Sequence, residues 1–347
     1  MPPAASGDPV SVVMPVHNAL PFLDAAIRSV LDQTHSDFEF VILDDASTDG
    51  SSERLRYWAE QDPRIRLFES ACKLGPVGSS NRVARHATGA IIARMDADDI
   101  SHPDRLREQI ELLSSRPDVE LVATLYEIID GEGCKVRGPD VWRLRPGSLS
   151  PPFPHGSMMF RRELFDRVGG YRAECEFWED QDFALRASSA TNILIIPKIL
   201  YRHRQSTAST RVASNADRVE RAVDRMYRCV EGLRATGTYE HLLVEKSRPE
   251  RVDPRVFISL GSLTLCSKGR PKLFGRLLKR GDIRLNARSL AALVWTAWAT
   301  ISPGSLRTCL GMLVQIRNRL GGSKFSLEEP IVWNPAISRI SSQPKPD

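Results

Sequence analysis

The sequence lacks any hydrophobic run long enough to cross a membrane. Its longest nearly uncharged apolar stretch, residues 290–301, has about 12 residues, whereas a spanning helix needs about 20. Residues 1–9 have neither a basic start nor an apolar run, so we recognise no secretory signal there. We therefore expect no transmembrane segment and a cytoplasmic location.

Paired cysteines and glycine-rich nucleotide fingerprints are also missing. The 6 cysteines lie far apart with no Cys-x-x-Cys pair, which argues against a zinc site or a disulfide framework. Neither G-x-G-x-x-G nor G-x-x-x-x-G-K-[ST] occurs, so a dinucleotide fingerprint and a P-loop are excluded. A phosphate-bearing ligand must be held in another way.

The composition is that of a folded protein, but its charge is unevenly distributed. Of the 347 residues 41% are hydrophobic and 26% charged, enough for one large domain or two modest ones. Residues 1–211 carry 25 Lys and Arg against 31 Asp and Glu (net −6), and residues 212–347 carry 23 against 12 (net +11). We predict a domain over residues 1–211 and a basic C-terminal region over residues 212–347.

The basic excess is sharpest in residues 268–319, where Lys and Arg face a single acid, Asp282. Leucines and tryptophans are interleaved with these cations, a composition that suits an anionic lipid surface. Two alternatives stay open, namely nucleic acid as the partner and an ordinary solvated face of helices. We favour peripheral contact with a membrane and no binding of nucleic acid.

The first two hundred residues alternate short β-branched runs with longer amphipathic ones, which indicates a parallel sheet with crossover helices. Glycines in residues 121–150 suggest hairpins and loops, and residues from 215 onward are mostly helical in pattern. The predicted strands are residues 10–14, 38–43, 65–68, 90–95, 157–160 and 193–196. The predicted helices are residues 22–33, 52–60, 79–87, 104–114, 162–168 and 180–190.

Polar residues follow three of these strands, at residues 15–18, 44–50 and 96–99. In an open α/β sheet the ligand lies beyond the carboxyl ends of the strands, so these segments should converge on one cleft. Asp96 and Asp98 offer the hard oxygen ligands that Mg²⁺ or Mn²⁺ takes together with substrate phosphates. The alternative is local capping, by Asp99 of the helix that follows and by Asp49 or its neighbours of the helix near residue 52.

Four blocks in order resemble the family 2 glycosyltransferases, which have the GT-A fold and include many bacterial polysaccharide and lipopolysaccharide sugar transferases. The resemblance covers about residues 10–210. It implies a mixed α/β fold, with a mainly parallel sheet flanked by helices and a mostly helical C-terminal extension. The blocks are residues 12–18 (VVMPVHN), 44–51 (DDASTDGS), 96–109 (DADD with Pro103, Arg105, Leu106 and Gln109) and 169–186 (GGY, then EDQD with Leu185 and Arg186).

The resemblance implies a role for individual residues. Asp45 would contact the base or ribose of the donor, and Asp98 would bind the divalent ion that bridges its diphosphate. Asp180 is the expected general base, with Glu179 and Asp182 as its rivals. The remaining residues of the donor site would be Pro15, Val16, His17 and Asn18 through their backbone, and Asp96 and Ala97 near the ribose and metal.

Two departures from the family pattern leave other roles open. An Arg-Asn pair is often found where this chain has Ser80-Asn81, so Asn81 is a candidate donor contact and Lys73 or Arg82 a candidate phosphate contact. A late histidine is shifted by one residue, which makes His203 a candidate third metal ligand. His155 would lie on the acceptor side or serve as a structural histidine.

Together these features predict an inverting, metal-dependent glycosyltransferase. It would move a sugar from a nucleoside-diphosphate donor, by our expectation a UDP-sugar, to a hydroxyl of a glycan or lipid-linked acceptor. The alternatives are a sugar-1-phosphate nucleotidyltransferase, which should carry a glycine-rich loop after its first strand, and an inactive binding protein. A processive synthase is disfavoured because several membrane spans are missing.

Overall fold

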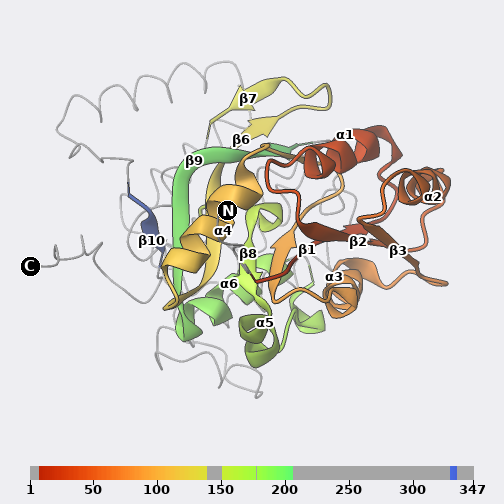
Figure 1. The fold of residues 1–347 in the computed structure, drawn as a ribbon. Helices are drawn as coiled ribbons and strands as arrows, with labels where there is room; N and C mark the ends of the chain where they lie inside the picture. The colour runs from red at the N-terminus through yellow and green to blue at the C-terminus, as the bar shows by residue number, and fades with distance from the viewer. Residues whose placement is uncertain (1–7, 139–150, 177, 206–328, 334–347) are drawn as a thin grey trace, which may run out of the picture. The chain divides into compact units, whose positions relative to one another are not determined.

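The predicted alternation of strands and helices is present in the computed structural model, which describes residues 8–138, 151–176, 178–205 and 329–333 (Figure 1). Buried residues of the first helix recur at Leu23, Ala26, Ile27 and Val30, the spacing of an amphipathic helix. The first elements are β1 (Val10–Val16), α1 (Leu20–Leu31), β2 (Phe38–Asp44), α2 (Ser51–Gln61), β3 (Ile65–Glu69), α3 (Gly75–His86) and β4 (Ile91–Arg94).

The strands β3, β2, β1 and β4 lie side by side in that order, and all their pairings are parallel. The register pairs Val16 with Asp44, and Asp44 with Glu69. The carboxyl ends of these strands therefore meet at the same edge of the sheet, as predicted for a ligand site.

The second half of the domain adds strands of mixed direction. β8 runs antiparallel to β4 and β6, while β6 and β9 are parallel. The elements are β5 (Ile100–Ser101), α4 (Arg105–Ser115), β6 (Val119–Ile129), β7 (Lys135–Arg137), η2 (His155–Ser157), β8 (Met159–Arg161), α5 (Arg162–Val168), η3 (Ala173–Cys175), α6 (Glu179–Ala190), β9 (Asn192–Arg204) and β10 (Ile331–Trp333).

The strand β9 is much longer than the predicted strand at residues 193–196 and curves along the sheet (Figure 1). Its register with β6 shifts between Thr124, which pairs with Ile196, and Leu125, which pairs with Ile199. Pro197 lies within this shift and has no N–H to donate to a neighbouring strand. The strand continues past the bulge and ends at Arg204 in the predicted site.

Helices cover both faces of the parallel strands. The main buried cluster joins alternate residues of β1 and β2, such as Val12 and Phe40, to side chains of α1, α2 and α4. The helix α3 contacts β1 and β2 as well. The alternate residues of these strands that are not in the main cluster point to the opposite face of the sheet. Ser11 of β1 is one of them, and its Oγ accepts from Gly89 N, just after α3. The start of α3 is thereby placed beside the carboxyl end of β2.

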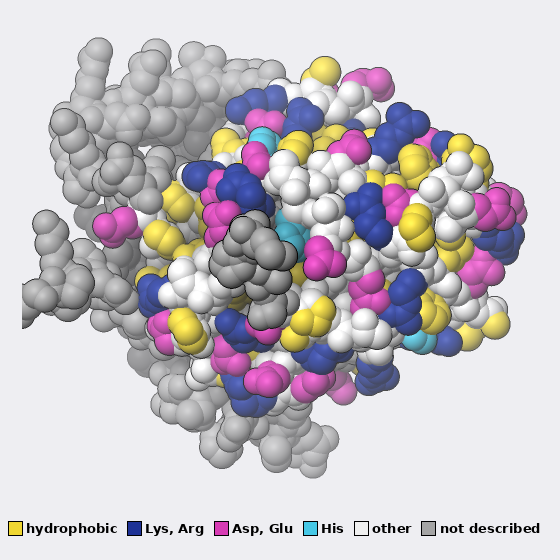
Figure 2. Space-filling view, viewed as in Figure 1, with side chains coloured by type: hydrophobic (Ala, Val, Ile, Leu, Met, Phe, Trp, Pro, Cys, Tyr) yellow, Lys and Arg dark blue, Asp and Glu magenta, His cyan; other side chains and the backbone are white. Residues whose placement is uncertain are grey.

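Most of the predicted basic C-terminal region, including residues 268–319, lies outside the described residues. Its described part forms the short strand β10, antiparallel to β9, where the pattern predicted helices. Trp333 is buried there in edge-to-face contact with Phe153. Among the described segments, every helix falls short of the length and hydropathy needed to span a bilayer. On the face in Figure 2, their acidic and basic side chains are interspersed.

Candidate active site

The ends of β1 and β2 are joined through His17. Its Nδ1 donates to the backbone oxygen of Asp45 at 2.8 Å, which leaves Nε2 to accept from Lys73 Nζ at 2.7 Å. Ala46 has φ 54° and Asn18 φ 53°, and a left-handed conformation at alanine costs about 1 kcal/mol or more. The predicted donor residues His17, Asp45 and Lys73 therefore lie together, in a turn that carries backbone strain.

The carboxylate of Asp45 holds the first turn of α3. It is 2% exposed and accepts from Leu74 N at 2.6 Å and from Gly75 N at 2.9 Å. These N–H groups have no partner within the helix, and the negative charge also suits the positive end of the helix dipole. Each oxygen keeps a second lone pair, so a donor contact by Asp45 remains compatible with its structural role.

Three aspartates and a histidine cluster beyond β4. Arg94 binds Asp96 at 3.0 Å, and Asp96 N donates to Tyr201 Oη at 3.3 Å. The fully buried Asp99 accepts from Arg204 N at 2.7 Å and from His203 Nδ1 at 3.2 Å. The suggestion that Asp99 caps α4 is therefore wrong, because both of its oxygens bond to the end of β9.

The crowding of carboxylates shifts the pKa values of groups in this cluster. Burial, together with the negative charges of Asp99 and Asp96, raises the pKa of Asp98 to about 7. Burial alone would lower the pKa of His203, but the same carboxylates and the hydrogen bond to Asp99 raise it to about 9. The cluster thus holds more negative charge than its surroundings easily stabilise.

A divalent cation fits this donor set. Asp96 and Asp98 supply the hard oxygens that Mg²⁺ and Mn²⁺ prefer, and His203 supplies an imidazole nitrogen. Across the described ranges, no group of three His, Cys, Asp or Glu side chains already stands in ligating geometry. Asp96, Asp98 and His203 therefore do not form a three-ligand group among the described residues.

The three acids at the start of α6 have different surroundings. Asp182 binds Arg186 at 2.6 Å, with both side chains almost fully buried. Asp180 is only partly buried and accepts from Gln181 N at 2.8 Å. Glu179 is also partly buried. Asp182 is therefore committed to its ion pair, which leaves Asp180 and Glu179 as the better candidates for the base.

His155 and Tyr171 form a hydrogen-bonded pair between the elements that carry the predicted carboxylates. Their Nε2 and Oη atoms share a hydrogen bond of 2.7 Å. Burial and the charge of Arg94 lower the pKa of His155 to about 4, against the opposing charges of Asp96 and Asp180. Burial also raises the pKa of Tyr171, and the charges of Asp96 and Asp180 add to it. Both carboxylates thus act on one buried pair.

Asn81, a predicted donor contact, holds the Gly-Gly-Tyr turn. Its Nδ2 donates to Tyr171 O at 2.8 Å and its Oδ1 accepts from Tyr171 N at 2.9 Å. A Cβ on Gly170, which has φ +62°, would lie 2.7 Å from Asn81 Oδ1. The side-chain amide of Asn81 is therefore hydrogen-bonded to the backbone of Tyr171.

The other predicted residues are backbone or core positions. Pro15 and Val16 pair with Leu43 and Asp44 in the sheet, and Val16 O accepts from Asp45 N at 2.7 Å, so part of their main chain is already hydrogen-bonded within the protein. Ala97 belongs to the buried cluster. Asn18 Oδ1 accepts from Thr48 N at 2.8 Å and so ties two of the polar segments together.

Sequence reasoning missed the buried arginines that support this site. Arg105 is fully buried and donates to Arg94 O at 3.1 Å and Gly156 O at 2.5 Å. Gln109, one turn later, donates to Ser157 O at 2.8 Å. A Cβ on Gly156 would lie 1.8 Å from Tyr201 Oη, so a residue with a side chain would clash with Tyr201 at this position. A charged residue at the end of an apolar strand, as in Ile91–Arg94, was the available signal.

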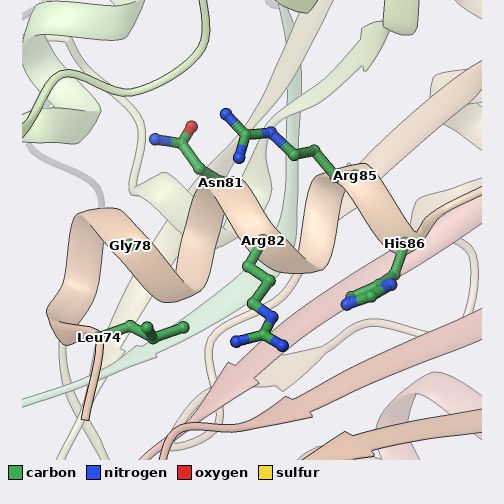
Figure 3. A pocket seen from close by; sticks show the side chains of 6 residues that line it. All are labelled: Leu74, Gly78, Asn81, Arg82, Arg85 and His86. Atoms are coloured by element: carbon green, nitrogen blue, oxygen red, sulfur yellow. The ribbon is translucent and has the colours of Figure 1, made fainter. Parts of the chain in front are cut away.

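The predicted carboxylates do not line the pocket shown in Figure 3. That pocket, of about 500 Å³, runs along α3 and includes Asn81 and Arg82. The side chains at the strand ends are instead drawn together by the hydrogen bonds and charge interactions described above.

Comparison with known sequences identifies relatives of this chain. The model described as Glycosyl transferase family 2 matches residues 11–172. EpsE of Bacillus subtilis (strain 168), which is named as a glycosyltransferase, is 35% identical over 188 residues, covering 52% of this chain and 67% of EpsE. The O-antigen biosynthesis glycosyltransferase WbnJ of Escherichia coli is 28% identical over 186 residues, covering 51% of this chain and 70% of WbnJ. Of four other bacterial relatives, this chain spans only 24 to 52%.

Solved structures share the fold. The mannosyltransferase PcManGT from Pyrobaculum calidifontis, in complex with GDP-Man and Mn²⁺, has a TM-score of 0.53 at 20% identity, covering 86% of this chain and 89% of PcManGT. TarS 1-349 from S. aureus, in complex with UDP-GlcNAc, has a TM-score of 0.51 at 15% identity, covering 75% of this chain and 81% of TarS 1-349. At these identities the likeness establishes the GT-A fold.

Proposed function

This chain belongs to glycosyl transferase family 2 and is a glycosyltransferase, and we propose that it transfers a sugar from a nucleoside-diphosphate donor to an acceptor hydroxyl with inversion at the anomeric carbon. The observation that carries this proposal is that the strand-end carboxylate Asp96 lies beside the segment of His155, where a Cβ on Gly156 would be 3.1 Å from Asp96 Oδ2, and that His155 is hydrogen-bonded to Tyr171 at 2.7 Å. The charges of Asp96 and Asp180 both affect the pKa values of this pair, which supports one site for the carboxylates after β4 and at the start of α6.

The donor side is formed by the strand ends. Asp45 and the backbone of residues 15–18 contact the nucleoside, and Lys73, held beside His17, brings a positive charge to its phosphates. Asp98, Asp96 and His203 are the residues that would hold Mg²⁺ or Mn²⁺. Such an ion supplies Lewis-acid stabilisation of the charge that develops on the leaving diphosphate.

The acceptor side requires one base. Asp180 removes the proton from the acceptor hydroxyl as its oxygen attacks the anomeric carbon, an effect worth about 10² to 10⁴ in rate. Because the attacking oxygen enters opposite the leaving diphosphate, one displacement inverts the configuration. A hydrolase would instead need two carboxylates flanking the glycosidic bond. The family membership likewise favours sugar transfer over the nucleotidyltransferase and the inactive binding protein.

For the donor and for the acceptor we propose a chemical class. We propose a UDP-sugar donor, although the similar structures were solved with different nucleotide sugars, GDP-Man and UDP-GlcNAc. We propose a glycan or lipid-linked acceptor, and contact of residues 268–319 with an anionic membrane surface. The support for this contact is the excess of Lys and Arg in that segment.

The proposal is tested by nucleotide release from UDP-, GDP- and dTDP-sugars with and without Mg²⁺ or Mn²⁺. We expect metal-dependent release from a UDP-sugar, and weaker metal-dependent donor binding in Asp98→Ala. Asp104→Ala is the matched control, because Asp104 is a partly exposed aspartate paired with Arg107 at the start of α4. Equal donor affinity in wild type and Asp98→Ala would contradict the assigned metal role.

A further inference from the structure

The pocket along α3 is separate from the carboxylate cluster. Its lining residues follow one another at helical spacing along α3. Their side chains diverge, with Asn81 and Arg85 on one side of the helix and Leu74, Arg82 and His86 on the other (Figure 3). They are Leu74, Gly78, Asn81, Arg82, Arg85 and His86. At about 500 Å³ the pocket is larger than a single phosphate group requires.

The two arginines that line the pocket have no acceptors among the described residues. Arg82 and Arg85 are exposed, and within the described part of the chain neither makes a hydrogen bond, an ion pair or a ring contact. The other described arginines each bind a carboxylate, a carbonyl or an aromatic ring, or have another interaction. His86 stacks on Phe68 with ring centroids 3.8 Å apart, while its Nε2 is buried without a partner among these residues.

Arg82 and Arg85 bring two positive charges to this pocket. Arg82 and Arg85 are three residues apart on one helix, where two cations repel each other. Burial, and then the charges of Arg82 and Arg66, lower the pKa of His86. A bound anion would relieve this repulsion and accept from the unpartnered donors. Guanidinium groups bind phosphate oxygens through paired N–H donors, so phosphate is the anion that suits them best.

The pocket is connected to the acceptor side of the site through Asn81. Asn81 lines the pocket, and its side-chain amide makes two hydrogen bonds to the backbone of Tyr171. The hydroxyl of Tyr171 is in turn hydrogen-bonded to His155. Of the residues expected on the donor side, His17, Asp45 and Lys73 do not line the pocket, whereas Asn81 and Arg82 do.

We propose that the pocket lined by Arg82, Arg85 and His86 binds a phosphate group carried by the acceptor, as an anion site separate from that of the donor diphosphate. This inference rests on the proposed function. The apolar end of the pocket, at Leu74 and Gly78, accommodates the uncharged part of such a ligand.

The test is NMR of histidine-labelled protein, with inorganic pyrophosphate and farnesyl diphosphate as separate probes. We expect either probe to shift the His86 resonance and to raise the pKa of His86. Binding of the probe should be about tenfold weaker or more in the double variant Arg82→Ala/Arg85→Ala. Arg56→Ala, which removes an exposed arginine of α2 paired with Glu69, should bind as wild type does. Tighter binding of farnesyl diphosphate than of pyrophosphate identifies a lipid-linked acceptor, and equal binding a soluble one.

Two results would overturn the inference. In one, neither probe moves the His86 resonance. In the other, UDP with Mn²⁺ moves it and competes with pyrophosphate, which would assign the pocket to the donor. Calorimetric titration of UDP with Mn²⁺ distinguishes a failure of this inference from a failure of the proposed function. The double variant should retain UDP binding. A wild-type protein that binds no nucleoside diphosphate would contradict the glycosyl-transfer proposal itself.

Discussion

The carboxylate of Asp182 lies 2.6 Å from the guanidinium of Arg186, one helical turn away, and both side chains are almost completely buried. Arg186 also donates to the carbonyls of Val168 and Gly170. The pair therefore fixes the turn that carries Tyr171, while Asp180, two residues earlier, remains partly exposed. Asp182 thus has a structural role, and Asp180 is the acid that we propose as the base.

This division predicts different effects on stability. Replacing Asp182 with Asn leaves the buried charge of Arg186 uncompensated, which we expect to cost about 3–5 kcal/mol of unfolding free energy. Asp180→Asn should change it by only about 0.5 kcal/mol, because its side chain is partly exposed. Urea unfolding of both variants measures the difference. A stable Asp182→Asn protein would show that the ion pair is not needed for folding.

A second prediction concerns the chemical step. Asp180→Asn should lower kcat for transfer by about 10² to 10⁴ while donor affinity stays within about twofold of wild type. Glu179→Gln is the matched control, since it changes the neighbouring acid in the same turn of α6 and should retain most activity. If Glu179→Gln loses transfer and Asp180→Asn retains it, the base has been assigned to the wrong residue.

Acid should weaken the contacts that β2 makes with β1, with β3 and with the loop before β4. The Glu39 carboxylate accepts from Ser11 Oγ at 2.5 Å and Thr88 Oγ1 at 2.8 Å, and it also binds Arg66. Burial would raise the pKa of Glu39, but these hydrogen bonds outweigh it and lower the pKa from 4.5 to about 2. Because the pKa is lower in the folded state, the ionised form stabilises the fold at pH values above 4.5.

We expect this contribution, about 2–3 kcal/mol, to be lost as the pH falls from about 4.5 to about 2. Unfolding free energies of wild type and Glu39→Gln should therefore differ at pH 7 and converge near pH 2. A difference that does not change with pH over this range would rule out the ionised carboxylate as its source. Glu120→Gln serves as a control acid on another strand, β6.

The sequence predicted the parallel half of the fold well and the later strands less well. The first strands are short apolar runs bounded by polar turns, so β1 and β2 were found to within two residues. The strand β9 was cut short in the prediction because Pro197 and Lys198 interrupt its apolar pattern. Its continuation is stabilised by β6, a pairing between distant segments that local patterns do not reveal.

The candidate site was likewise predicted in part. The polar strand ends gave Asp45, Asp96 and Asp98 from their positions alone, because parallel strands end at a common edge. The pattern could not separate ligand-facing from structural side chains. Asn81 holds the backbone of Tyr171, and Asp99 bonds to the end of β9, contacts that only the tertiary structure reveals.

The basic segment 268–319 gives a separate prediction about location. Vesicles containing anionic lipid should carry the wild-type protein upward in a flotation gradient, with each cation near the surface contributing about 1 kcal/mol. Charge reversal at Arg276, Lys279, Arg280 and Arg284 to Glu should abolish flotation. Neutral vesicles provide the control for lipid charge. Unchanged flotation of the reversed variant would contradict membrane contact through this segment.

The central claim is that Asp98 and Asp180 face each other across one donor site. Anomalous diffraction at the manganese edge, from crystals of the protein with Mn²⁺ and UDP, tests it most directly. The account predicts an anomalous peak bound by Asp98 and the UDP diphosphate, with the Asp180 carboxylate opening onto the same hollow. A peak away from Asp98, or an Asp180 carboxylate that opens onto a different surface, would contradict it.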